Sequence, residues 1–469
     1  MTCFYAFYKL TESPPTWFDE GTFIQVAHSI AYHGIQGIQT APGIFASTGH
    51  ISGGFPFLWP VALSLKVFGN SLFAARLPMA LFIVVCAGAA YLFIYSLCGP
   101  LEALLALLLI ATFPILYGNG KNVLGEVPGM FYTISALYFL WQLEVHAYKG
   151  ARWYVFAGLC VGLAAATKPI FLLLPAALLL VWIVQAWRRP SLWRAVWPGV
   201  LAVIVILLLW AYLQFGSTDT LSSIFSHYTN PYAETSLVHI VLQNVLRFFT
   251  ELTPMYCATL MLLWTVAVGI RVYYKKELSL SEQAAFAFSL LILAAYVRTA
   301  GWYRYFFEAM VLALIFAPVS LHIISAQVAK WRPTVSIVKL WTVPLLLLGA
   351  AQLYSLNYSS WVSEHNNSIK TAQMEAYFPL FPQHKSVLIY NTPEVVPFLT
   401  TDDYYQYFDT GPVGMFAYGQ SNSALVEKGA FDFVITTSGY YQEYPQLFAQ
   451  YEQTDSVADY TVLAHKPLP

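Results

Sequence analysis

Ten long apolar stretches run through the middle of this chain, and they constrain its fold more than any other feature. They lie near residues 73–97, 101–118, 127–143, 154–167, 170–187, 195–214, 254–272, 284–299, 305–327 and 335–355. A helix needs about 20 apolar residues to cross the core of a bilayer. Only 10% of the 469 residues are charged, whereas a soluble protein carries about 25%. The pattern therefore predicts a mainly α-helical polytopic membrane protein with about ten spans.

Lysine and arginine are concentrated in four of the short loops between these stretches. The clusters are Lys149/Arg152, Arg188/Arg189/Arg194, Arg271/Lys275/Lys276 and Lys330/Arg332/Lys339. Short basic loops stay on the cytoplasmic side of a membrane, and with ten spans all four clusters fall on that side. The other connections then share the outer side, and they are residues 1–72, 118–126, 168, 215–252, 299–304 and everything after 356.

The tail, residues 357–469, has shorter apolar runs than the rest of the chain. Residues 386–390 and 431–435 have the length and composition of strands, and Pro393 and Pro397 mark turns between them. We expect a small soluble α/β domain on the outer side of the membrane. The sequence has neither a GxGxxG nor a P-loop motif, which argues against nucleotide binding. No nucleic-acid partner is expected either.

The chain thus divides into three parts. Residues 1–72 form an outer loop that carries the candidate catalytic acids, residues 73–356 form the transmembrane bundle, and residues 357–469 form the soluble domain. Within the first part, residues 57–69 are apolar but too short to span a bilayer. We expect them to form an interfacial or re-entrant helix that ends at Gly69.

Two adjacent carboxylates, Asp19 and Glu20, stand just ahead of the apolar stretches, after Trp17-Phe18. An acid at the edge of a membrane is costly to keep there, which favours a functional role, and a carboxylate can act as a general base. The alternative is an ordinary acidic pair at the start of a helix. Glu126 begins a span two residues before Pro128. It is either a second active-site acid or a carboxylate satisfied by backbone amides.

Cationic residues at the same outer ends are candidates for binding a phosphate group. They are Lys121, Lys168, Arg298 and Arg304, the last followed by Tyr305. Arginine binds phosphate through a planar fork of N–H donors. The alternatives are that these side chains extend to lipid headgroups, or that Arg304 pairs with Glu308 one helical turn away.

The sequence offers no evident metal site. The five cysteines show no CxxC spacing and are interpreted as buried apolar residues. His28, His33 and His50 share the first outer loop without an HxxxH or HExxH pattern. No cofactor is therefore predicted with certainty, and a divalent cation beside Asp19 and Glu126 stays open.

Several short motifs, taken together, resemble those of GT-C fold glycosyltransferases, in particular the protein O-mannosyltransferase and lipid A aminoarabinose transferase families. The motifs are Trp17-Phe18-Asp19-Glu20-Gly21, residues 51–63 (ISGGFPFLWPVAL), Lys66-Val67-Phe68-Gly69, Ala75-Arg76-Leu77-Pro78, Gly125-Glu126-Val127-Pro128, residues 162–169 (GLAAATKP) and Arg304-Tyr305. Their order and spacing cover about residues 17–330. In these families a proline usually follows the Arg-Tyr pair, where this chain has Glu308. A transmembrane helix usually precedes the acidic loop, whereas only sixteen residues precede Trp17 here, too few to span at about 1.5 Å per residue.

The resemblance implies an enzyme that moves a sugar from a polyprenyl-phosphate donor to a glycan, lipid or protein acceptor on the outer side of a bacterial plasma membrane. Asp19 would be the general base, Glu20 its neighbour and Glu126 the second acid. The phosphate-side candidates would be Lys121, Lys168, Arg298, Arg304 and Tyr305.

Two other classes of function compete with this reading. A transporter or flippase of lipid-linked sugars would carry charges or broken helices at mid-membrane, together with inverted repeats, and the sequence shows neither. A catalytically inactive scaffold of envelope assembly could keep the same fold, and the presence of Asp19 argues mildly against it.

Overall fold

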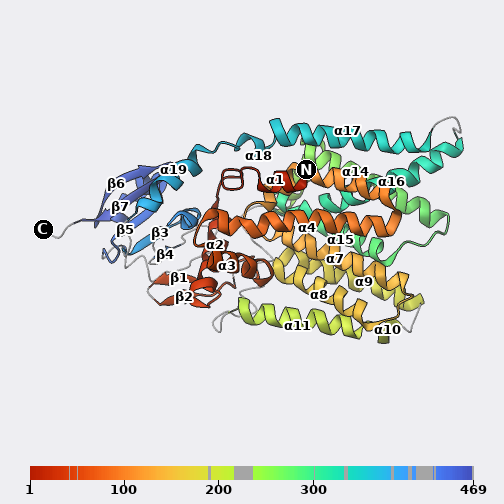
Figure 1. Cartoon of the computed structure of the whole chain (residues 1–469), viewed down its shortest axis with the longest axis horizontal. Helices are drawn as coiled ribbons and strands as arrows, with labels where there is room; N and C mark the ends of the chain where they lie inside the picture. Colours follow the sequence, from red (N-terminus) through yellow and green to blue (C-terminus); the bar gives the residue numbers. More distant parts are fainter. Residues whose placement is uncertain are drawn as a thin grey trace.

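The computed structural model describes most of the chain. The described residues are 1–41, 43–49, 51–188, 192–215, 236–299, 301–331, 336–381, 385–399, 404–407, 426 and 429–466. They form a bundle of long helices with a smaller sheet-containing domain at one end, on the left in Figure 1. Helices α2 and α3 lie at that same end, while the short α10 lies at the opposite one (Figure 1).

Each of the ten expected spans falls on a helix or a pair of helices. The bundle consists of α4 (Leu72–Cys98), α5 (Pro100–Ala111), α6 (Pro114–Gly120), α7 (Glu126–Val145), α8 (Ala151–Thr167), η1 (Pro169–Leu172), α9 (Leu173–Arg188), α10 (Leu192–Ala195), α11 (Trp197–Gln214), α13 (Leu237–Thr250), α14 (Leu252–Tyr273), α15 (Leu280–Tyr296), η2 (Tyr303–Tyr305), α16 (Phe307–Trp331) and α17 (Ile337–Tyr358). Of the described helices, six are long and apolar enough to cross a membrane. A seventh span results if α5 and α6, bent by 59° at their junction, count as one. The mainly helical membrane fold is confirmed.

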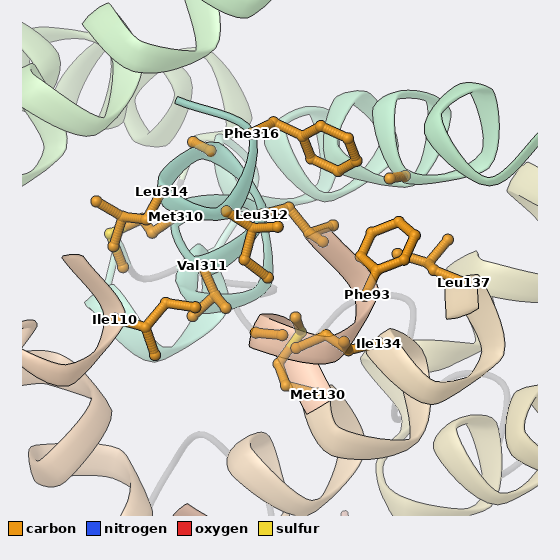
Figure 2. Packing of buried hydrophobic residues seen from close by; sticks show 14 of the residues in the cluster. Phe93, Ile110, Met130, Ile134, Leu137, Met310, Val311, Leu312, Leu314 and Phe316 are labelled. Carbon is orange, nitrogen blue, oxygen red and sulfur yellow. The ribbon is translucent and has the colours of Figure 1, made fainter. Parts of the chain in front are cut away.

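Helix α16 forms the centre of the bundle. Every residue from 309 to 317 is at most 1% exposed, as expected for a helix that is apolar on all sides and surrounded by others. Figure 2 shows side chains of α16 meeting those of α4, α5 and α7, for example Phe316 beside Phe93. The two rings pack edge to face with centroids 5.9 Å apart. Because α16 is enclosed in this way, its first turn begins inside the protein.

The first part of the chain folds into short elements against the end of the bundle. They are α1 (Thr2–Phe7), α2 (Phe18–His33), β1 (Ile38–Ala41), β2 (Ile44–Ala46) and α3 (Phe55–Phe68). The expected short helix at 57–69 is confirmed as α3, which ends at Gly69 with a φ of 86°. The amide of Gly54 donates to the carbonyl of Thr167 at 3.1 Å. This bond fixes the start of α3 against the end of α8.

The tail folds into a five-stranded mixed sheet with short helices around it. The strands are β3 (Val387–Tyr390), β4 (Tyr404–Tyr407), β5 (Phe433–Thr437), β6 (Tyr451–Val457) and β7 (Tyr460–His465), and the helices are α18 (Trp361–Glu364), α19 (Ile369–Tyr377), η3 (Phe378–Leu380), η4 (Pro393–Phe398), α21 (Ser438–Glu443) and η6 (Pro445–Phe448). The order is β4-β3-β5-β7-β6, with β3 parallel to β4 and β5 and the other pairs antiparallel. The expected strands near 386–390 and 431–435 are confirmed as β3 and β5.

The domain is joined to the end of the bundle where α2 and α3 lie, through contacts between η4 and α2. A Cβ atom at Gly21 would lie 2.2 Å from the backbone carbonyl carbon of Pro393, so only glycine allows the two segments to approach this closely. Gly21 stands two residues after Asp19 in the first turns of α2. The soluble domain therefore packs directly on the helix that carries the first candidate acid.

Candidate active site

Three helices begin at this end of the bundle with a carboxylate in the first turn. They are α2 with Asp19 and Glu20, α7 with Glu126, and α16 with Glu308. The free amides at a helix N-terminus create a positive potential that favours negative charge there. The four carboxylates nevertheless have different surroundings, and the surroundings separate their roles.

Glu20 is enclosed in an ion pair whose hydrogen bonds are all satisfied inside the protein. Arg76 on α4 donates to its two carboxylate oxygens at 2.7 and 2.6 Å, and both side chains are 0% exposed. The amide of Val123 adds a third hydrogen bond of 3.1 Å. Arg76 also donates to the carbonyls of Leu10 and Pro14, at 2.8 Å each. This pair joins the first segment, α4 and the loop before α7.

Asp19 has the opposite environment, because its side chain is 34% exposed. One of its oxygens accepts a hydrogen bond from Arg304. The Arg304 guanidinium is 9% exposed and lies against the rings of Trp17, Trp302 and Tyr305, with its carbon 5.0, 4.7 and 5.1 Å from their centroids. Burial alone would lower the pKa of Arg304, but the charge of Asp19 raises it above its ordinary value. Arg304 is therefore a permanent cation beside a half-exposed carboxylate.

Arg304 retains hydrogen-bonding capacity in this position. One terminal nitrogen donates to the Tyr305 hydroxyl at 3.3 Å. The buried Nε atom has no partner among the described residues. A guanidinium has five N–H donors in a fixed fork, so this one can bind a further anion while it holds Asp19.

Glu126 and Lys168 form a second ion pair nearby. The Lys168 ammonium lies 2.5 Å from one Glu126 oxygen, and the two side chains are 7% and 1% exposed, respectively. Lys168 stands at the break between α8 and η1 in an extended conformation, as expected for a residue before a proline. The second oxygen of Glu126 is buried without a partner in the described part of the chain. Unlike the Glu20 pair, this pair is only partly satisfied.

Glu308 is the fourth carboxylate, and the sequence did not identify it as a site residue. Its side chain is 0% exposed, and neither oxygen has a hydrogen-bond partner on another described residue. Its charge interacts electrostatically with those of Glu126 and Lys168. The pairing with Arg304 considered above is wrong, because Arg304 bonds to Asp19. The signal in the sequence was the glutamate at a position where related families usually have proline.

Two of the predicted phosphate-side residues lie apart from this group. Lys121 is 1% exposed and donates to the carbonyl of Tyr8 at 2.6 Å. Burial and the nearby Arg76 lower its pKa to about 7, which places it beside the Glu20 pair. Arg298 is exposed just past the end of α15, and no hydrogen bond to its side chain is found within the described ranges. The structure thus brings together Asp19, Glu126, Lys168, Arg304 and Tyr305, but not Lys121 or Arg298.

A network that sequence reasoning missed supports the loop that carries Arg304. Asn244 on α13 donates to three carbonyls at the end of α15, those of Tyr296, Val297 and Thr299, at 3.4, 3.2 and 2.7 Å. The Tyr303 hydroxyl donates to Glu251 at 2.7 Å. Helix α13 and the residue that follows it, Glu251, therefore both hold this loop. Amide and carboxylate side chains 50 residues away in the chain carry no local signal for such a role.

No group of three or more His, Cys, Asp or Glu side chains within the described ranges could hold a metal ion. Glu126 and Glu308 are two carboxyl groups only, and Glu126 is already paired with Lys168. The divalent cation beside Asp19 and Glu126 stays a prediction.

Comparisons with known proteins agree with the overall fold. Residues 54–213 match the family described as dolichyl-phosphate-mannose-protein mannosyltransferase. The structure of ArnT from Cupriavidus metallidurans bound to undecaprenyl phosphate is similar with a TM-score of 0.67 and 15% sequence identity, covering 99% of this chain and 96% of that one. The fold is that of the GT-C glycosyltransferases. The resemblance inferred from the motifs is thereby confirmed.

Other solved structures extend the same comparison. The apo state of that ArnT has a TM-score of 0.66 and 14% identity, over 98% of this chain and 95% of the other. The oligosaccharyltransferase AglB from Archaeoglobus fulgidus, in complex with an inhibitory peptide and a dolichol-phosphate, has a TM-score of 0.54 and 13% identity, over 98% of this chain and 74% of the other. No curated protein sequence matches this chain. At these identities the structural comparisons establish the fold alone.

Proposed function

We propose that this protein is a membrane glycosyltransferase that moves a sugar from a polyprenyl-phosphate donor to an acceptor on the outer side of a bacterial plasma membrane. The observation that carries the proposal is the half-exposed Asp19 held beside a permanent cation, Arg304. A similar fold binds undecaprenyl phosphate in ArnT and dolichol-phosphate in AglB. The acceptor is a glycan, a lipid or a protein.

The reaction follows from the chemistry of the two partners. Asp19 takes the proton from an acceptor hydroxyl while that oxygen attacks the anomeric carbon of the sugar from the face opposite the phosphate. The new bond joins the acceptor oxygen to the anomeric carbon, and the bond from that carbon to the phosphate oxygen breaks. The electron pair of the broken bond stays on polyprenyl phosphate, so that the configuration at the anomeric carbon inverts. The leaving group is already a phosphate and needs no general acid.

The cations of the site supply the charge that the leaving group requires. Negative charge grows on the phosphate as the bond breaks, and fixed donors in a site shielded from water stabilise such charge. Arg304 has an unused N–H and donates a hydrogen bond to the Tyr305 hydroxyl. Lys168 is buried next to Glu126. Glu20 does not take part in the chemistry, because Arg76 and Val123 occupy its oxygens. It orients the first turn of α2 and thus the Asp19 side chain.

The proposal is tested by sugar transfer in membranes that contain the protein. A panel of radiolabelled polyprenyl-phosphate sugars is supplied to wild type and to Asp19→Asn. Release of label from at least one donor by wild type, and its loss in a folded Asp19→Asn protein, is the expected result. If the folded wild type releases label from no donor, or if Asp19→Asn releases it as fast as wild type, the assignment is wrong. Such a result would favour the alternative functions, a transporter of lipid-linked sugars or a scaffold.

A further inference from the structure

Glu308 is the carboxyl group of the site that receives no hydrogen bond on either oxygen from another described residue. It stands in the first turn of α16, the central helix of the bundle, and is fully buried. The amides of that turn favour its negative charge, but neither oxygen is bound by another described residue. A buried acceptor without a partner costs stability, and each such group in a native protein calls for an explanation, of which a functional role is one.

The neighbouring ion pair of Glu126 and Lys168 also has an unsatisfied carboxylate oxygen. The second oxygen of Glu126 is buried and unbound, and the charge of Glu126 interacts with that of Glu308. Together the two residues present three carboxylate oxygens that lack partners in the described structure. A ligand that supplies hydrogen-bond donors at this point would satisfy these oxygens.

The chemistry of these oxygens narrows the class of partner. A phosphate group fits poorly, because it brings further negative charge and acceptor oxygens to a place that already has unbound acceptor oxygens. A bound cation is disfavoured, because Lys168 already lies 2.5 Å from Glu126 and no third acidic or imidazole ligand joins the group within the described ranges. Sugar hydroxyls donate one hydrogen bond each and fit the requirement.

We propose that Glu308, together with the unbound oxygen of Glu126, accepts hydrogen bonds from hydroxyl groups of the donor sugar and so determines which sugar the enzyme accepts. This inference rests on the function proposed above. It divides the site into two parts. Arg304 and Lys168 bind the phosphate that all polyprenyl-phosphate donors share, whereas Glu308 recognises the sugar that distinguishes them.

If Glu308 recognises the sugar and Arg304 the phosphate, substitutions of these two residues should affect the binding of polyprenyl phosphate and of its sugar-bearing form differently. Purified protein is titrated with polyprenyl phosphate and with the polyprenyl-phosphate sugar that wild type transfers best. Glu308→Leu, which is close in volume, and Glu308→Gln, which keeps one acceptor oxygen, are compared with Arg304→Ala. We expect Glu308→Leu to weaken binding of the sugar-bearing lipid roughly 10- to 100-fold, the range for hydrogen bonds to a charged group. Glu308→Gln should weaken it less, and neither should change binding of polyprenyl phosphate.

Arg304→Ala is the matched control, since it should weaken both lipids to a similar extent. Thermal unfolding of each variant shows that it is folded, and Glu308→Leu should unfold at the same or a higher temperature because a buried unpaired carboxylate is removed. Equal losses for the two lipids in the Glu308 variants, or no loss for either, would overturn the inference. A folded wild type that binds neither lipid would instead overturn the proposed function.

A second experiment distinguishes recognition of the sugar by Glu308 from an indirect effect of the substitution on the structure of the site. Donors that each lack one sugar hydroxyl are compared with the parent donor in wild type and in Glu308→Leu. Wild type should lose transfer efficiency with the deoxy donor whose missing hydroxyl faces Glu308, and Glu308→Leu should no longer distinguish that donor from its parent. A variant that still discriminates among all the deoxy donors as wild type does would contradict the inference.

Discussion

Asp19 and Glu20 are neighbours in the chain, yet they belong to two regions with opposite properties. Glu20 lies in a closed region in which Arg76, Val123 and the first segment satisfy every charge. Asp19 lies in an open region, where Arg304 has an unused donor and two further carboxylates have unused oxygens. A closed ion pair can only hold a structure in place, whereas an open one can bind something else. In the proposed function, Glu20 is therefore a supporting residue and Asp19 the reacting one.

The two regions also differ in what they do to stability. Breaking a buried ion pair leaves an uncompensated charge and is strongly destabilising. Buried polar groups without partners, such as those of Glu126 and Glu308, lower stability already in the free protein, and removing such groups from a functional site often stabilises a protein. Substitutions can therefore assign each carboxylate to one region. In the open region activity should fall without a loss of stability, and in the closed region stability should fall first.

The largest expected effect is that of Asp19→Asn on transfer. The amide keeps the size of the side chain but cannot accept the proton, and loss of a general base typically slows a reaction by about 10²- to 10⁴-fold. The unfolding temperature should stay close to that of wild type, since Asp19 is partly exposed. Initial rates of label transfer, measured on equal amounts of folded protein, check the size of the loss.

Glu20→Gln should act mainly on folding. The substitution leaves the fully buried Arg76 without its counter-charge, which costs about 3–5 kcal/mol in comparable cases. The midpoint of thermal unfolding in detergent should fall strongly. The double variant with Glu20→Met and Arg76→Met should cost less than the sum of the two single changes, because neither charge is then left unpaired. Additive losses would contradict the closed ion pair.

Gly21→Ala tests the contact between the soluble domain and α2. The added methyl group would overlap the backbone of Pro393 at 2.2 Å, and overpacking of this kind costs typically about 1–3 kcal/mol. The tail should become more sensitive to protease while the bundle stays intact. Gly269→Ala in α14 is the matched control, because nothing lies within 4 Å of a Cβ at that position. It should leave both properties unchanged or raise stability slightly.

The smallest expected effect is that of Lys121 on the pH dependence of the free energy of unfolding. Burial and then Arg76 lower its pKa from 10.5 to about 7 in the folded protein. Between pH 7 and 10.5 the unfolded chain holds a proton that the folded protein has released, so the free energy of unfolding rises with pH in this window. The expected slope is on the order of 1 kcal/mol per pH unit. Unfolding of wild type and Lys121→Met at pH 7, 8 and 9 checks it, and the variant should show a flatter profile.

The sequence predicted the architecture well where the signal was local. Each apolar stretch became a helix, and β3 and β5 appeared where short apolar runs predicted strands. Strand β6 was missed because its sequence, YEQTDSV, is polar and mostly exposed. Strand β4 was missed because four residues without a flanking apolar run carry too little pattern.

The sequence pointed to five residues that lie together in the structure, but it also pointed to Lys121 and Arg298, which lie apart from them, and it missed Glu308. Consecutive residues of a helix point about 100° apart, so Asp19 and Glu20 cannot share one environment. The sequence does not show which of them is buried, because that depends on the position of Arg76 on α4. Glu308 could not be placed from the sequence, because its burial depends on the helices that surround α16. Lys121 was close to Glu126 in the chain but points to Tyr8 instead.

The most direct test of the account measures binding and transfer on the same preparations of Asp19→Asn and Glu20→Gln. The account predicts that Asp19→Asn binds the polyprenyl-phosphate donor about as well as wild type and unfolds at the same temperature, yet transfers sugar at least about 100-fold more slowly. It predicts that Glu20→Gln loses stability first, and that the molecules which remain folded still transfer sugar. Fast transfer by Asp19→Asn, or a stable Glu20→Gln protein without activity, would contradict the division between the two carboxylates.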